Sequence, residues 1–92
     1  MVIARNVVGP KIRARRCQLK LTQAMLAARC RRLGWDISRE TLAKIEAQFR
    51  WVSDFELLCL AMALNTTVSE LLPSMDQASA LLKKTFGKLA TE

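Results

Sequence analysis

Apolar residues recur every three or four positions along most of the chain, and no segment of useful length alternates between apolar and polar residues. A period of about 3.6 residues is typical of α-helices with one buried face, whereas strands alternate with a period of two. The pattern therefore predicts an all-α protein. We expect five short helices around one core, followed by an appended C-terminal helix.

Residues that favour helix ends divide this pattern into elements. Pro10 suits the first turn of a helix, Thr22 and Ser38 are good N-caps, and Gly34 is a good stop. A Ser or Thr followed three residues later by Glu or Gln predicts further helix starts at Ser53, Thr67 and Ser74. The expected helices cover about 10–19, 23–33, 39–48, 54–64 and 68–72, with a sixth beginning after Ser74.

The elements suggest three parts: an N-terminal arm (1–8), one helical domain (9–73) and a tail helix (74–92). We expect the core to include Leu26, Ala27, Leu42, Ile45, Phe55, Leu58 and Leu64. Trp51 is assigned to the core, with a self-association surface as the alternative. The tail helix has an apolar stripe formed by Ala78, Leu82, Phe86 and Leu89.

Positive charge is concentrated in the first part of the chain. Residues 1–50 contain 12 basic and 3 acidic residues (+9), and residues 51–92 contain 3 basic and 5 acidic residues (−2), which together give the net charge of +7. Such an asymmetry attracts polyanions, although it also serves solubility.

The residues that are absent limit the chemistry. The chain has no His and no Tyr, and only three Gly, so we expect neither an enzyme nor a bound cofactor or metal. Its three Cys, Cys17, Cys30 and Cys59, have no C-x-x-C spacing, and we expect small buried or half-buried residues in a reducing compartment. We expect neither a signal peptide nor a membrane span, and we expect a cytoplasmic protein associated with the nucleoid.

The segments LTQAMLAA (21–28) and ISRETLAKIE (37–46), with Gly34 between them, resemble the helix-turn-helix of the phage Cro and repressor family, the XRE-type regulators. The resemblance extends from about Val8 to Leu72 and includes the ending LAMALN (60–65) and TVSELL (67–72). It implies a five-helix, lambda-repressor-like DNA-binding domain. Residues 29–33 lengthen the stretch before the turn relative to the usual family pattern.

In this family the helix that starts at Ser38 enters the major groove of double-stranded DNA. The resemblance therefore implies base contacts by Arg39, Glu40 and Lys44. Arg39 can donate two hydrogen bonds to guanine, Lys44 can reach guanine or a phosphate, and Glu40 can accept a bond from cytosine. A merely solvated polar helix face is the alternative interpretation.

The resemblance also implies phosphate contacts by Thr22, Gln23, Ser38, Thr41, Gln48 and Arg50. Thr22 and Ser38 are equally explained as helix caps. Arg16 and Glu46 match positions that form a structural ion pair in phage repressors, so we assign neither of them to DNA. Arg13, Arg15, Arg29, Arg31 and Arg32 are expected to contribute loosely to the positive field.

A helix-turn-helix regulator of this size is expected to bind DNA as a homodimer, for which the tail helix, alone or together with Phe49, Trp51 and Val52, is the candidate surface. The alternatives for the tail helix are a flap packed on the same monomer and a partly frayed end. The function that we expect is sequence-specific transcriptional regulation, by repression. The alternative is an antitoxin-like or accessory module, in which the same fold binds a protein partner. A membrane-surface role is disfavoured because the apolar faces are expected to form a core.

Overall fold

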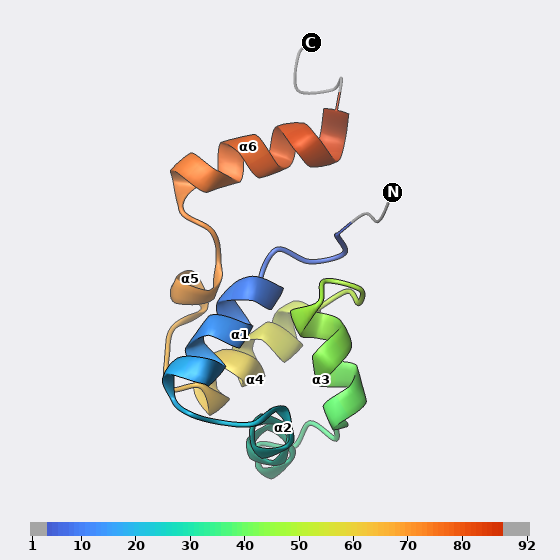
Figure 1. Cartoon of the computed structure of the whole chain (residues 1–92), viewed down its shortest axis with the longest axis vertical. Coiled ribbons are helices and arrows are strands. Elements are labelled where there is room, and N and C mark those ends of the chain that lie inside the picture. Colours follow the sequence, from blue (N-terminus) through green and yellow to red (C-terminus); the bar gives the residue numbers. More distant parts are fainter. Residues whose placement is uncertain (1–3, 88–92) are drawn as a thin grey trace.

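The computed structural model describes residues 4–87, which form six α-helices and no strand (Figure 1). The helices are α1 (Gly9–Gln18), α2 (Gln23–Arg32), α3 (Arg39–Glu46), α4 (Asp54–Ala63), α5 (Val68–Leu71) and α6 (Met75–Phe86). The all-α class predicted from the sequence is confirmed. None of the described helices is long and apolar enough to cross a membrane.

Hydroxyl side chains begin five of the six helices. Thr22, Ser38, Ser53, Thr67 and Ser74 each accept a hydrogen bond from the backbone N–H three residues later. The side-chain oxygens of Glu56 and Gln77 in turn accept from the backbone N–H groups of Ser53 and Ser74, which completes two capping boxes. The five caps explain why the predicted helix starts agree with the structure, since each cap favours one starting point by about 1 kcal/mol.

The first five helices enclose one core. α2 packs on α3 and α4, α1 packs on α3 and α5, and α4 packs on α5. The largest fully buried side chains are Ile12, Leu26, Leu42, Ile45, Leu60, Leu64, Leu71 and Cys30. Trp35, in the turn before α3, lies against this core and is half-buried.

Three of the predicted core residues lie outside the core. Phe55 is 82% exposed, Leu58 51% and Trp51 69%. α4 is apolar on two sides, and the side that carries Leu60 and Leu64 faces the core, so Phe55 and Leu58 point away from it. The expectation for these residues was wrong because a helix that is apolar all round has no pattern that identifies its inner face.

The N-terminal segment is attached to the end of α3. The backbone N–H of Arg5 donates to the carbonyl of Gln48 at 2.9 Å. The side-chain amide of Asn6 donates to the carbonyls of Ile45 and Arg50, and its oxygen accepts from the backbone N–H of Gly9. Val8 is buried. The part predicted as an arm is therefore, from Arg5 onward, packed on the helical body.

Gly9 allows α1 and α3 to approach closely. A Cβ atom at this position would lie 2.5 Å from the carbonyl oxygen of Ile45 and 2.8 Å from that of Glu46. Both contacts are with backbone atoms, which cannot move aside as a flexible side chain can. The absence of a side chain at Gly9 thus sets the distance between the start of α1 and the end of α3.

α6 lies apart from the five-helix body (Figure 1). None of its residues is buried, and it forms no packing comparable to that among α1–α5. Its position gives residues 4–87 an elongated outline of 45 × 24 × 22 Å. Leu89, the last member of the predicted tail stripe, lies outside the described residues.

Candidate nucleic-acid interface

α2, the turn and α3 form a rigid unit with one outward face. The turn is closed by a bond from the Arg31 guanidinium to the carbonyl of Ile37 at 2.8 Å and by a bond from the backbone N–H of Trp35 to the carbonyl of Cys30. Gly34 has φ +106°, a conformation that favours glycine. The lengthened 29–33 stretch continues α2 to Arg32.

The outer face of α3 is polar and the inner face is apolar. Leu42 and Ile45 are fully buried, whereas Arg39, Glu40 and Lys44 are exposed and Thr41 is half-buried. Arg39 and Glu40 form only a loose ion pair, with 3.9 Å between Nε and Oε1. The three residues expected to contact bases therefore lie together on an accessible surface of a helix whose other side is fixed.

A chain of four side chains connects this face to the interior. Arg16 on α1 donates two hydrogen bonds to the buried carboxylate of Glu46, at 2.7 and 3.0 Å. The amide of Gln23 donates to the same carboxylate at 3.1 Å, and its oxygen accepts from the Arg39 guanidinium at 3.1 Å. Gln23, at the start of α2, thus contacts both ends of α3.

The ion pair at the centre of this chain has a structural role. The hydrogen bonds that Arg16 donates to Glu46 raise the pKa of the guanidinium, against the opposing effect of its burial. Arg16 also donates to the carbonyl of Leu21 at 2.8 Å, which fixes the connector between α1 and α2. Because most of both side chains is buried, removing one partner would leave a poorly solvated charge.

The helix starts beside this face offer further hydrogen-bonding groups. The Thr22 hydroxyl accepts from the backbone N–H of Met25, and the Ser38 hydroxyl accepts from that of Thr41. The Ser38 hydroxyl also donates to the Thr41 hydroxyl oxygen at 3.0 Å. Thr22 and Ser38 are exposed, so their capping role leaves them accessible to a phosphate.

Gln48 and Arg50 have partners within the chain. The side-chain amide of Gln48 donates to the carbonyl of Asn6 at 3.0 Å. The Arg50 guanidinium donates to both carboxylate oxygens of Glu56, at 3.0 and 3.1 Å, and this contact lowers the pKa of Glu56. These two residues hold the loop that follows α3.

Several arginines that were expected only to contribute positive charge also donate hydrogen bonds to backbone carbonyls. Arg15 donates to the carbonyls of Leu64 and Asn65, and Arg29 donates to that of Ala63. These carbonyls end α4 and have no partner within the helix, so the guanidinium groups act as C-terminal caps. No residue spacing in the sequence indicates these contacts, because they join segments more than 30 positions apart.

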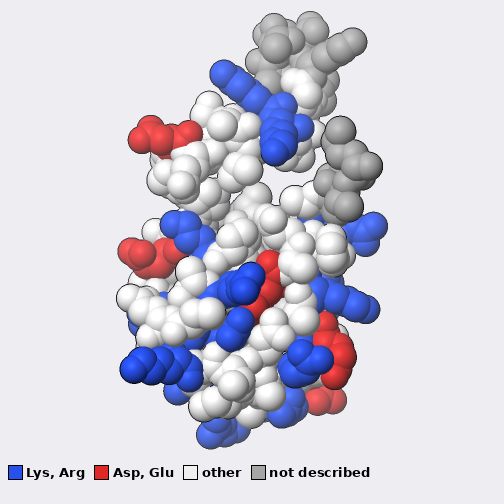
Figure 2. Space-filling view, viewed as in Figure 1, with Lys and Arg blue, Asp and Glu red and all other residues white. Residues whose placement is uncertain are grey.

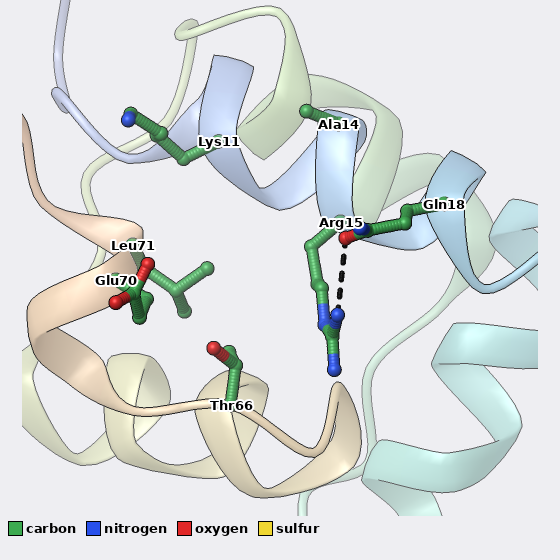
Figure 3. A pocket seen from close by; sticks show the side chains of 7 residues that line it. All are labelled: Lys11, Ala14, Arg15, Gln18, Thr66, Glu70 and Leu71. Carbon is green, nitrogen blue, oxygen red and sulfur yellow. Dashed lines mark hydrogen bonds between the residues drawn. The ribbon is translucent and has the colours of Figure 1, made fainter.

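Arg15 also borders an open hollow of about 520 Å³ between α1 and α5 (Figure 3). The hollow is lined by Lys11, Ala14, Arg15, Gln18, Thr66, Glu70 and Leu71. The Arg15 guanidinium is turned toward Gln18 and donates to its side-chain oxygen at 3.0 Å.

Positive charge is spread over the five-helix body. Figure 2 shows Lys and Arg side chains around much of the visible surface, with fewer Asp and Glu side chains between them. Guanidinium groups bonded to neutral carbonyls keep their charge, so Arg15, Arg29 and Arg31 contribute to this field while they hold the fold. The surface around α3 thus combines an exposed polar face with a positive background.

The three cysteines are free thiols; Cys17 is exposed, contrary to expectation, and burial governs the chemistry of Cys30 and Cys59. Cys30 is fully buried, and desolvation, aided by the neighbouring Cys59, raises its pKa to about 12. Burial also raises the pKa of Cys59. Both thiols therefore stay protonated at neutral pH, which makes them weak nucleophiles. Residues 4–87 contain no group of three or more His, Cys, Asp or Glu side chains that could hold a metal ion.

One comparison with known proteins identifies the fold family. The family model described as helix-turn-helix matches residues 12–71, which include α2, the turn and α3 and extend through α5. Neither a curated protein nor a solved structure matches the chain.

Proposed function

Because the chain belongs to the Cro/C1-type (XRE) helix-turn-helix family, whose members are DNA-binding regulatory domains and not enzymes, we propose that it is a transcriptional repressor that binds a specific operator. The observation that carries the proposal is the outward face of α3. Arg39, Glu40 and Lys44 are exposed there, while Leu42 and Ile45 anchor the opposite face in the core. We call α3 the reading helix.

The reading helix recognises bases through three side chains. Arg39 donates to O6 and N7 of a guanine, Glu40 accepts from a cytosine amino group, and Lys44 binds a guanine or an adjacent phosphate. The bond between Gln23 and Arg39 supports this assignment, because it restricts the guanidinium before DNA arrives. A side chain that is already positioned loses less conformational entropy on binding.

Phosphates are bound at the two helix starts and around them. Thr22, Gln23, Ser38 and Thr41 provide hydroxyl and amide groups beside the N-termini of α2 and α3, where the helix dipole favours anions. Gln48 and Arg50 are secondary contacts, since each must leave a partner within the chain to reach a phosphate. Phosphate contacts position the domain and are the same for every sequence.

The regulator acts as a homodimer on nucleoid DNA in the cytoplasm. Two reading helices then address two half-sites about one helical turn apart, roughly 34 Å. The second half-site doubles the number of base contacts. One small domain alone makes too few contacts to reach specific affinity.

A second candidate function is an antitoxin-like or accessory module that binds another protein. The exposed apolar side of α4 favours it, since Phe55, Leu58 and Met62 lie on one helical face and each is more than half exposed. A stoichiometric protein partner purified with the full chain, and lost on Phe55→Ser, would support this candidate.

Selection of bound duplexes from a random DNA pool tests the repressor proposal. We expect an enriched inverted repeat and an affinity that falls linearly with salt on logarithmic axes. Arg39→Ala should weaken binding to the selected site by about 10- to 100-fold and relax the preference at one base pair. Lys11→Ala, on α1, is the control for loss of one charge. No enrichment together with a flat salt response would overturn the proposal.

A further inference from the structure

α6 presents an apolar stripe that nothing in the described part of the chain covers. Met75 is 85% exposed, Leu82 53% and Phe86 55%. At 100° per residue, spacings of seven and four residues place these side chains within about 40° of one another around the helix axis. Ala78 lies beside them on the same face. A capped helix of about three turns therefore displays an apolar surface to solvent.

Two of the three charged residues of α6, Asp76 and Lys83, lie along one edge of this stripe. Asp76 and Lys83 are seven residues apart, so they lie on the same flank of the helix, about 10 Å from each other along its axis. That separation is too long for an ion pair within one helix, and residues 4–87 contain none between them. Lys84 points away from the stripe.

We propose that α6 pairs antiparallel with α6 of a second copy of the chain. In an antiparallel pair the same flank of both helices meets, so Asp76 of each copy lies beside Lys83 of the other, twice by symmetry. The apolar residues then match in size: Ala78 faces Leu82 of the second copy, and Met75 faces its Phe86. In a parallel pair opposite flanks meet, so neither Asp76 nor Lys83 would face a charged residue of the second copy.

Charge distinguishes α6 from the other exposed apolar face. α4 carries Asp54 and Glu56 and no basic residue, and Glu56 is already bonded to Arg50. A symmetric pairing of α4 would therefore have no cation on that helix to meet Asp54. α6 carries a negative residue near its start and a positive residue near its end, which is the arrangement that an antiparallel pair requires.

The length of α6 sets the strength of the contact. Its 12 residues span about 18 Å, and two such helices bury less than the roughly 1,200 Å² of a standard stable interface. The dimer is therefore weak in free solution. When two copies are bound to adjacent half-sites, their high effective concentration favours the pairing. This inference deepens the proposed homodimer, but the contact itself does not depend on DNA binding.

Sedimentation equilibrium of the full chain tests the pairing through charge reversal. Asp76→Lys and Lys83→Asp should each raise the dimer dissociation constant about tenfold at low salt, because two attractive contacts become repulsive. The double variant should dimerise like the original chain, and an equimolar mixture of the two single variants should form the mixed dimer. Lys84→Asp, which makes the same charge change on the far side of α6, is the matched control.

Three outcomes would overturn the pairing: no dimer at any concentration, single reversals that act like Lys84→Asp, or a double reversal that does not restore association. Loss of dimerisation on Phe55→Ser with unchanged behaviour of the α6 variants would assign the contact to α4. Circular dichroism verifies that each variant keeps its helices. The proposed function is judged separately, from the affinity of each variant for a duplex with one half-site, which the α6 substitutions should leave unchanged.

Discussion

α3 and α6 are both short helices with two different faces, and they are used in opposite ways. α3 buries Leu42 and Ile45 and exposes Arg39, Glu40 and Lys44. α6 buries none of its residues, so its apolar stripe is exposed. The exposed face indicates the partner: a polar, cationic surface on a fixed helix suits a polyanion, and an apolar stripe with charges of both signs suits a second copy.

The largest effect that separates the two helices is on folding. Leu42→Ala should lower the free energy of unfolding by about 2–5 kcal/mol, because it leaves a cavity in the core. Leu82→Ala removes the same atoms from an exposed site and should change the unfolding free energy by less than about 0.5 kcal/mol. Urea denaturation at low protein concentration, where the chain is monomeric, measures both. Equal losses would show that α6 packs on the body.

The second largest effect is the loss of stability when the ion pair between Arg16 and Glu46 is broken. Glu46→Ala should destabilise the fold by about 3 kcal/mol, since it leaves the Arg16 guanidinium in a site that is mostly closed to water. Thermal denaturation of the single variant and of Arg16→Met with Glu46→Leu provides the comparison. The double variant should recover most of the stability, because two apolar side chains need no partner. A double variant as unstable as the single one would contradict this account.

Features that depend on neighbouring residues were predicted from the sequence, and features that depend on packing between distant segments were not. Helix starts such as Thr22 and Ser38 were predictable because capping is local. The inner side of α4 was not predictable, since Phe55 and Leu60 are equally apolar and only packing with α2 and α5 decides between them. The bonds of Arg15 and Arg29 to the end of α4 depend on the completed fold, so no short-range pattern contains them.

Substitution of Gln23 tests whether its contact with Arg39 positions that side chain for DNA binding. Gln23→Ala removes the contact that restricts Arg39 and should weaken binding to the selected operator about tenfold. Arg39→Ala and the double variant complete a double-mutant cycle, and we expect a coupling of at least about 0.5 kcal/mol between the two residues. The affinities come from fluorescence anisotropy with a labelled duplex. Additive losses would mean that Gln23 binds a phosphate without positioning Arg39.

The smallest effect concerns the loop after α3 and is a dependence on pH. The Arg50 guanidinium holds the pKa of Glu56 below its usual value of 4.5, so the folded state binds this proton less readily than the unfolded state. The stabilisation is therefore fully present at neutral pH and is lost as pH falls through the lowered pKa of the folded state. Glu56→Gln should cost up to about 1 kcal/mol at pH 7 and less at pH 3. Asp54→Asn, next to the same cap but without an ion pair, is the control in urea denaturation at both pH values. The amide oxygen of Gln can still accept from the backbone N–H of Ser53, so this variant keeps the cap and loses only the ion pair. No cost at pH 7 would therefore assign the role of Glu56 to its cap and would leave Arg50 free to bind phosphate beside the reading helix.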